Sequence, residues 1–215
     1  MEIDDAFVAT GISALIKHPT EGLILFETGS GENWPTGWEP PYNDLFTQID
    51  YTEDNELPTA IAKTVHSSKY IKAVSLGHLH LDHAGGLEHF VGTDIPIYTF
   101  NIKSLEVFSG LTVCHAQGHT PGFCLMQVNL RERDLDLLHF RSVSSKRELR
   151  EGSSARYAHR SLLLGMGTAD SIKASRLEIR MIGYIQTMLE RTDAKFVFGH
   201  DKETFSYKHA PEFSM

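Results

Sequence analysis

Histidine and aspartate side chains gather in one short stretch of this sequence, from His78 to His83. The stretch reads His-Leu-His-Leu-Asp-His and is followed by Ala-Gly-Gly. In an extended segment residues i and i+2 point the same way, so His78 and His80 should converge on one side. Asp82 and His83 would face the same space once the chain turns. Three imidazoles and a carboxylate are poorly placed in an apolar core without partners, whereas both groups are ordinary zinc ligands. The stretch therefore predicts a metal site.

Two further histidines follow predicted strands, each in a turn that contains glycine. His119 lies in Gly-His-Thr-Pro-Gly, after a strand expected over residues 111–114. His200 lies in Phe-Gly-His-Asp, directly after a strand expected over residues 195–198. Histidines at strand ends are held by a rigid scaffold at the rim of a sheet. Together with the first stretch, they predict two metal sites of three or more ligands each.

The elements that must position these side chains can be read from the pattern of apolar residues and turns. The expected strands cover residues 7–16, 22–26, 70–76, 95–100, 111–114, 124–130 and 195–198. The expected helices cover residues 57–67, 87–90 and 169–191. Strand pairs followed by strands that alternate with helices predict a layered α/β architecture. Residues 131–168 show no clear period and stand apart as an atypical segment.

A loop rich in glycine, proline and aromatic residues runs from Gly29 to Tyr42. Aromatic side chains on a proline-stiffened loop can form the wall of a ligand pocket. Trp34, Trp38 and Tyr42 would then favour an apolar or aromatic small molecule. The alternative is that the tryptophans simply cover the core, and the sequence leaves both interpretations open.

Composition excludes several classes of function. The formal net charge of −8 argues against a nucleic-acid partner. The longest apolar runs fall far short of the roughly 20 residues of a membrane span, and no secretory signal is visible. Cys114 and Cys124 cannot form a disulfide scaffold, and free thiols are typical of a reducing compartment. We therefore expect a cytoplasmic protein without a membrane partner.

The motifs HLHLDHAGG, GHTPG and FGHD, in this order, resemble the metallo-β-lactamase superfamily. Within it, the chain is most similar to the N-acyl homoserine lactonase branch and to related fungal hydrolases that open lactone or lactam rings. Glu27-Thr-Gly29, after a strand, resembles the Asp-Thr-Gly of the family. The resemblance implies a single domain over residues 1–215 with an αββα four-layer sandwich. It also implies a two-metal site at one edge of that sandwich.

The same resemblance implies a role for each ligand-type residue. His78, His80 and His119 would hold a first zinc ion. Asp82, His83 and His200 would hold a second. Thr120 and Asp201 are candidates for orienting the ligand imidazoles, with simple turn formation as the alternative.

The chain departs from the family pattern after residue 126. For the carboxylate that bridges the two metals we expect Asp136, with Asp134 as the alternative; a third interpretation is that neither reaches the metals. His139 falls where lactonases carry a tyrosine that polarises the substrate carbonyl. The spacing between His83 and His119 is too short for most of the helical lid of the lactonase branch.

The function that these residues imply is zinc-dependent hydrolysis of a small lactone or lactam ring by a metal-bound hydroxide. Asp82 or Asp136 would transfer the proton, and His139 would bind the carbonyl oxygen. One alternative is a glyoxalase-type thioesterase or a phosphodiesterase of the same fold. Another is an inactive metal-binding remnant, favoured by the missing lid and the uncertain bridging carboxylate. The expected partner is a small apolar or aromatic molecule, and a homodimer is an open alternative.

Overall fold

The computed structural model divides the chain into two compact units, residues 1–98 and 99–215. The structure describes residues 13–40, 42–64, 66–100, 104–116, 119–120, 122–129, 134–138, 168–192 and 195–199. Each unit is described by itself below. The prediction of a single domain over residues 1–215 stays a prediction.

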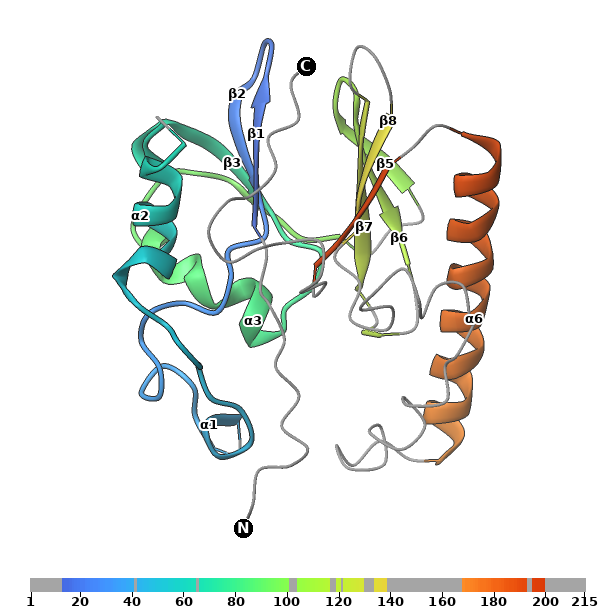
Figure 1. The fold of residues 1–215 in the computed structure, drawn as a ribbon, viewed down its shortest axis with the longest axis horizontal. Coiled ribbons are helices and arrows are strands. Elements are labelled where there is room, and N and C mark those ends of the chain that lie inside the picture. The colour runs from blue at the N-terminus through green and yellow to red at the C-terminus, as the bar shows by residue number, and fades with distance from the viewer. Residues whose placement is uncertain are drawn as a thin grey trace. The chain divides into compact units, whose positions relative to one another are not determined.

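The N-terminal unit is built on a four-stranded sheet in the order β1-β2-β3-β4, and Figure 1 labels its first three strands. The strands are β1 (Ala14–His18), β2 (Gly22–Phe26), β3 (Ile71–Ser75) and β4 (Ile97–Tyr98). Strands β1 and β2 form an antiparallel hairpin, and β2, β3 and β4 run parallel. The strands predicted over residues 22–26 and 70–76 are confirmed, whereas the one expected over 95–100 has only two residues. Of the strand expected over residues 7–16, residues 14–16 belong to β1, which continues to His18, and residues 7–12 lie outside the described residues.

Short helices connect the strands of this unit. They are α1 (Tyr42–Leu45), η1 (Glu53–Asn55), α2 (Leu57–Ala62), η2 (Ser68–Tyr70), α3 (Leu81–Ala84) and η3 (Gly85–Phe90). The helix predicted over residues 57–67 ends at Ala62 because the next residues, Lys63 and Thr64, are exposed and give it no further apolar face to bury. The short helix predicted over residues 87–90 is confirmed as part of η3.

The core of the N-terminal unit fixes the end of β3, where the histidine-rich stretch begins. Its buried members are Leu25, Leu57, Ile61, Ile71, Val74, Leu76 and Phe90. Strand β3 has a parallel neighbour on each side, and its residues from Ala73 to Ser75 are all buried. A strand covered on both faces is mostly apolar, and in β3 the exposed Lys72 interrupts the buried residues. The stretch that starts at His78 thus follows a largely buried strand of the unit.

The second unit carries a five-stranded sheet whose order follows the sequence, β5-β6-β7-β8-β9. The strands are β5 (Ser104–Phe108), β6 (Leu111–His115), β7 (Cys124–Asn129), β8 (Asp134–Leu138) and β9 (Lys195–Phe198). Strands β5 to β8 are antiparallel neighbours, and β9 runs parallel to β8. The sequence analysis expected β6, β7 and β9 but missed β5 and β8.

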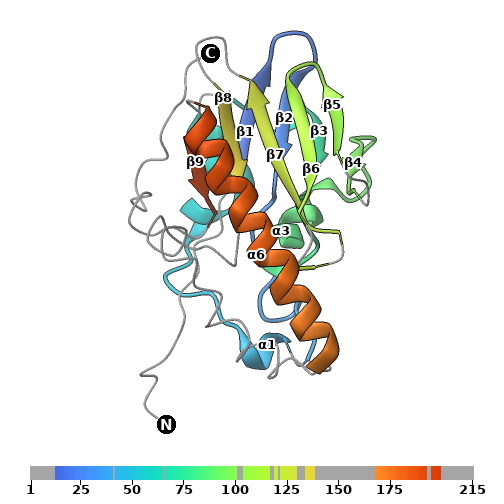
Figure 2. The same cartoon turned by 90° about the vertical axis from the view of Figure 1, so that its right-hand side faces the viewer.

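One long helix, α6 (Thr168–Arg191), covers a face of this sheet (Figure 2). Ile182 and Ile185 of α6 pack with Ala116, Phe123 and Leu125. Leu189 of the same helix also packs against this cluster. The helix expected over residues 169–191 is therefore confirmed. Within the described part of the chain, no helix combines the length and apolarity needed to cross a bilayer.

Candidate metal centre

The histidine-rich stretch connects the end of β3 to α3. His80 lies directly before α3 in an extended conformation, with φ −68° and ψ 154°. Its carbonyl oxygen accepts hydrogen bonds from the backbone N–H groups of His83 and Ala84, at 3.0 and 2.9 Å. The chain therefore turns into the helix immediately after His80. This is the turn that the sequence analysis required to bring Asp82 and His83 back toward the first two histidines.

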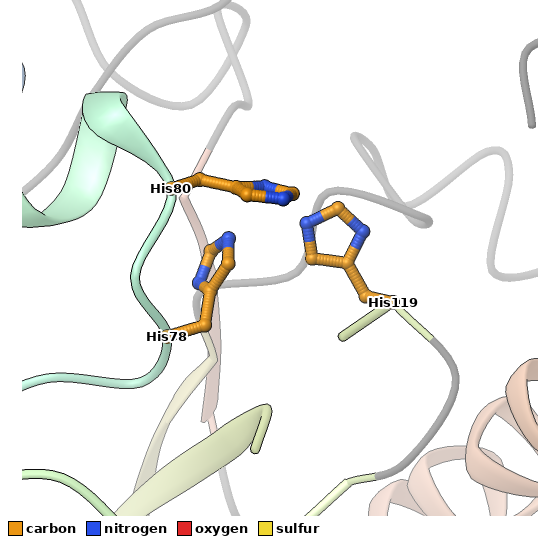
Figure 3. A group of neighbouring side chains, drawn as sticks. All are labelled: His78, His80 and His119. Carbon is orange, nitrogen blue, oxygen red and sulfur yellow. The ribbon is translucent and has the colours of Figure 1, made fainter. Parts of the chain in front are cut away.

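His78 and His80 lie side by side, as their i, i+2 spacing predicted (Figure 3). Their ring centroids are 4.6 Å apart, with an angle of 69° between the ring planes. A ligand nitrogen of one lies within 4.8 Å of a ligand nitrogen of the other. Zinc binds imidazole nitrogen at about 2.0–2.1 Å, so two nitrogens this close can bind one ion after a small adjustment.

His83 is fully buried between two carboxylates. Its Nε2 lies 3.5 Å from Oδ2 of Asp82, and its Nδ1 lies 3.5 Å from Oε2 of Glu27. Its ring centroid is also 3.8 Å from that of His78. The N-terminal unit by itself thus brings together the four predicted ligands of the stretch 78–83 and adds a fifth ionisable side chain, Glu27.

Glu27 is a residue to which the sequence analysis gave no role. It lies directly after β2 with a left-handed φ of 65°, and its side chain is fully buried. Its backbone N–H donates to the carbonyl of Ser75, and its Oε1 accepts from the backbone N–H of Gly77, both at 2.9 Å. Glu27 therefore joins the end of β2 to the segment that leads into His78. The signal in the sequence was its place in Glu-Thr-Gly after a strand.

The electrostatics of this group favour a positive charge at its centre. Burial raises the pKa of Glu27, and the neighbouring His83 opposes that rise. Burial alone would lower the pKa of His83, but Glu27 and Asp82 overcome it and raise that pKa to about 9. The two carboxylates thus favour a positive charge on the imidazole between them.

Gly85 and Gly86 are required by close packing rather than by an unusual backbone conformation. Gly85 has ordinary helical angles, φ −60° and ψ −41°. A Cβ atom on Gly85 would lie 2.1 Å from the carbonyl oxygen of Ser30, and one on Gly86 would lie 2.2 Å from that of Thr28. Thr28 also donates from both N and Oγ1 to the carbonyl of His83, each at 2.8 Å. The chain after β2 therefore packs tightly against the segment that follows the ligands.

The tryptophans of the loop over residues 29–42 are anchored to the unit. Nε1 of Trp38 donates to the carbonyl of Ser30 at 3.2 Å, and Trp38 is buried. Nε1 of Trp34 donates to the carbonyl of Phe46 at 3.4 Å. Of the two interpretations of this loop, the structure supports core coverage for Trp38. Tyr42 is half exposed.

The remaining predicted ligands belong to the second unit. His119 and Thr120 lie in the bend between β6 and β7, and Figure 3 also draws His119. The His119 ring packs edge-on against Phe123, with centroids 5.5 Å apart. Asp136 lies in the middle of β8, opposite Gln127 of β7 and Phe196 of β9, and Asp134 lies at the start of that strand. His139, His200 and Asp201 lie outside the described residues.

Comparisons with known proteins identify the fold. A curated N-acyl homoserine lactonase from a Bacillus species is 26% identical over 130 residues, covering 47% of this chain and 52% of the relative. A Bacillus thuringiensis AiiA variant with N-decanoyl-L-homoserine bound at its active site superposes with a TM-score of 0.63. That match has 19% identity and covers 89% of this chain and 81% of the other. The chain has the metallo-β-lactamase fold.

A second lactonase structure agrees with this result. AidC, a dizinc quorum-quenching lactonase in complex with a homoserine product, superposes with a TM-score of 0.53 at 15% identity. The match covers 94% of this chain and 79% of the AidC chain. No family model matches the chain. The predicted αββα fold class and the resemblance to lactonases are thus confirmed, although the chain spans about half the length of the curated relative.

Proposed function

We propose that this protein is a metal-dependent hydrolase that opens a lactone ring. The observation that carries the proposal is the convergence of His78, His80, Asp82 and His83 at the end of the buried strand β3. The curated relative and the solved structures are named as lactonases, which favours a lactone over a thioester or a phosphodiester. The names of these proteins also do not support the alternative that this chain is an inactive metal-binding remnant.

The side chains present fit a divalent metal. The donor set consists of imidazoles and one carboxylate, which are the ligands that zinc takes in hydrolases. Two carboxylates, Glu27 and Asp82, also lie 3.5 Å from the two nitrogens of the His83 ring, which places negative charge around the proposed metal. We propose that His78, His80 and His119 hold one zinc ion and that Asp82, His83 and His200 hold a second. Such a pair of ions activates water and polarises the carbonyl of the substrate.

The residues of the chain then have distinct tasks. Asp82 is the acidic residue of the stretch that solvent reaches, since its side chain is 25% exposed. We propose that its Oδ2 accepts a proton during attack on the ring carbonyl and returns it to the alkoxide that leaves. Glu27 and Thr28 fix the segment that carries His83. Asp136 as the bridging ligand and His139 as the carbonyl-binding group remain part of the proposal.

The substrate class is also part of the proposal. The ligands named in the two lactonase structures are acylated homoserines, N-decanoyl-L-homoserine in one and a product homoserine in the other. We therefore propose a small acylated lactone with an apolar chain as the substrate. A lactam ring, the absence of a nucleic-acid partner, a cytoplasmic location and a homodimer stay predictions from the sequence.

The experiment that tests this function measures ring opening directly. Purified protein loaded with zinc is assayed by pH-stat against N-decanoyl homoserine lactone, a thioester and a phosphodiester. We expect turnover of the lactone, loss of turnover after chelation, and a loss of at least about 100-fold in kcat/KM for His80→Ala. His66→Ala is the matched control, because it removes an imidazole of the same unit that belongs to no ligand group. Faster turnover of the thioester or phosphodiester would refute the proposal.

A further inference from the structure

The N-terminal unit contains a second group of ligand-type side chains that differs from both predicted zinc sites. Glu27, His78 and His83 each place one ligand atom within 4.8 Å of the others. All three side chains are buried, with exposed fractions of 0%, 4% and 0%. One carboxylate with two imidazoles is a ligand set that zinc uses with its fourth position open. The whole group lies within residues 1–98 and needs no residue of the second unit.

One atom of this group, Oε2 of Glu27, lacks the hydrogen bond that burial normally demands. Oε1 accepts from the N–H of Gly77, but Oε2 is buried and accepts no hydrogen bond. A buried carboxylate oxygen without a hydrogen bond is unfavourable unless a cation lies beside it. The oxygen faces His83 at 3.5 Å from Nδ1, a distance longer than the usual 2.7–3.2 Å of an N–H···O bond. Two ligands of a tetrahedral zinc ion, each about 2.0–2.1 Å from the metal, lie about 3.4 Å apart.

We propose that Glu27, His78 and His83 form an inner metal position of the N-terminal unit that binds one divalent transition metal. The position uses Nδ1 of His83, whereas Asp82 approaches Nε2 of the same ring. A neutral imidazole has one nitrogen free for a metal, so a metal at the inner position and a metal beside Asp82 exclude each other. His78 is likewise shared with the predicted first zinc site. The inner position is therefore an alternative to the two-metal arrangement, occupied by a single ion.

The inner position depends on a glutamate. The resemblance places an aspartate at this point of the family motif, and this chain carries the longer Glu27. The longer side chain accepts the Gly77 N–H through one oxygen and presents the other to His83. Shortening it by one methylene would withdraw one of these two contacts. The identity of residue 27 is thus predicted to decide whether the unit can hold a metal by itself.

The test uses a variant of the full chain in which both predicted zinc sites are dismantled. His80→Ala, His119→Ala and His200→Ala together leave His78 alone in the first site, and Asp82 with His83 in the second. The inner group stays intact. The protein is stripped with a chelator and titrated with Zn²⁺ by calorimetry, and with Co²⁺ by visible absorption. We expect one ion per chain and the visible band of four-coordinate cobalt.

Two further substitutions in this triple variant identify the carboxylate. Glu27→Gln keeps the acceptor for Gly77 but removes the charge, and we expect it to weaken Zn²⁺ binding at least tenfold. Asp54→Asn is the control, since Asp54 is an exposed carboxylate of the same unit that pairs with Lys63 and belongs to none of the ligand groups of the described residues. We expect it to change affinity less than twofold. Circular dichroism checks that each protein folds, and Glu27→Asp replaces Glu27→Gln if the latter does not.

Three outcomes would overturn the inner position. They are no metal binding by the triple variant, unchanged binding after substitution of Glu27, and a loss of binding in Asp54→Asn as large as that in Glu27→Gln. None of these measurements involves a substrate. A failure of the inner position would leave lactone hydrolysis untouched, and an inactive protein could still bind a metal at Glu27.

Discussion

The carboxylate of Glu27 lies against the imidazole of His83, with Oε2 3.5 Å from Nδ1. Glu27 follows β2 and His83 lies in α3, so this contact joins two segments that are far apart in the sequence. The other carboxylate oxygen holds the backbone of Gly77. One buried side chain therefore fixes both the entry to the ligand stretch and its last histidine.

The first prediction concerns the stability that Glu27 provides. Glu27→Ala leaves the buried N–H of Gly77 without an acceptor, and we expect the free energy of unfolding to fall by about 1–3 kcal/mol. Glu27→Gln retains an acceptor oxygen and should recover most of this loss. Urea unfolding of the chelator-treated proteins measures both. Equal losses for the two variants would show that the Gly77 hydrogen bond is not the cause.

The second prediction concerns the close approach at Gly86. A methyl group there would lie 2.2 Å from the backbone oxygen of Thr28, which cannot rotate away. We expect Gly86→Ala to destabilise the protein by at least about 1–3 kcal/mol, the range for overpacking. Gly183→Ala in α6 is the control, because a Cβ there meets nothing within 4 Å. It should be stabilising by about 0.5–1 kcal/mol, since alanine favours helix. A harmless Gly86→Ala, seen in thermal unfolding, would contradict the packing described above.

The third prediction is a pH dependence of the chelator-treated protein. The pKa of His83 is raised from 6.5 to about 9 in the folded state. The folded state thus holds a proton that the unfolded state releases, and the resulting stability is fully present below pH 6.5. It is lost as the pH rises from 6.5 through 9. Burial also raises the pKa of Glu27. The stability that its proton provides is therefore likewise lost as the pH rises above the ordinary pKa of a glutamate.

The measurement for this dependence is urea unfolding at pH 6.5 and at pH 9. We expect the unfolding midpoint to be lower at pH 9. Glu27→Gln removes the charge that raises the pKa of His83, so its midpoint should change less between the two values. If the unfolding midpoint of Glu27→Gln falls as much between the two pH values as that of the parent protein, other groups cause the pH dependence.

The parts of the fold that could be predicted from the sequence are those with strong local patterns. The mostly apolar residues of β3 and the apolar face of α6 each specify one element by themselves. Strand β5 was missed although Leu105 and Val107 alternate with Glu106 and precede a turn at Gly110. Strand β8 was missed because its alternating aspartates and leucines follow a run of charged residues and gave no continuous apolar signal.

In the site, too, contacts between residues close in the sequence could be predicted, and contacts between distant segments could not. The convergence of His78 and His80 follows from their spacing alone, and the structure agrees. The contact between Glu27 and His83 depends on how β2 and β3 pair, which no local pattern specifies. The need for glycine at position 85 has the same origin, because its cause is the backbone of Ser30. The backbone angles of Gly85 are ordinary for a helix, so close packing is the reason for a glycine there.

The most direct test of the proposed function combines metal content with ring opening in one preparation. Zinc per chain is measured by mass spectrometry, and lactone hydrolysis is measured before chelation, after it and after zinc is restored. The account predicts up to two zinc ions per chain, loss of hydrolysis when they are removed, and its return with zinc. Full hydrolysis by the chelated protein would contradict it.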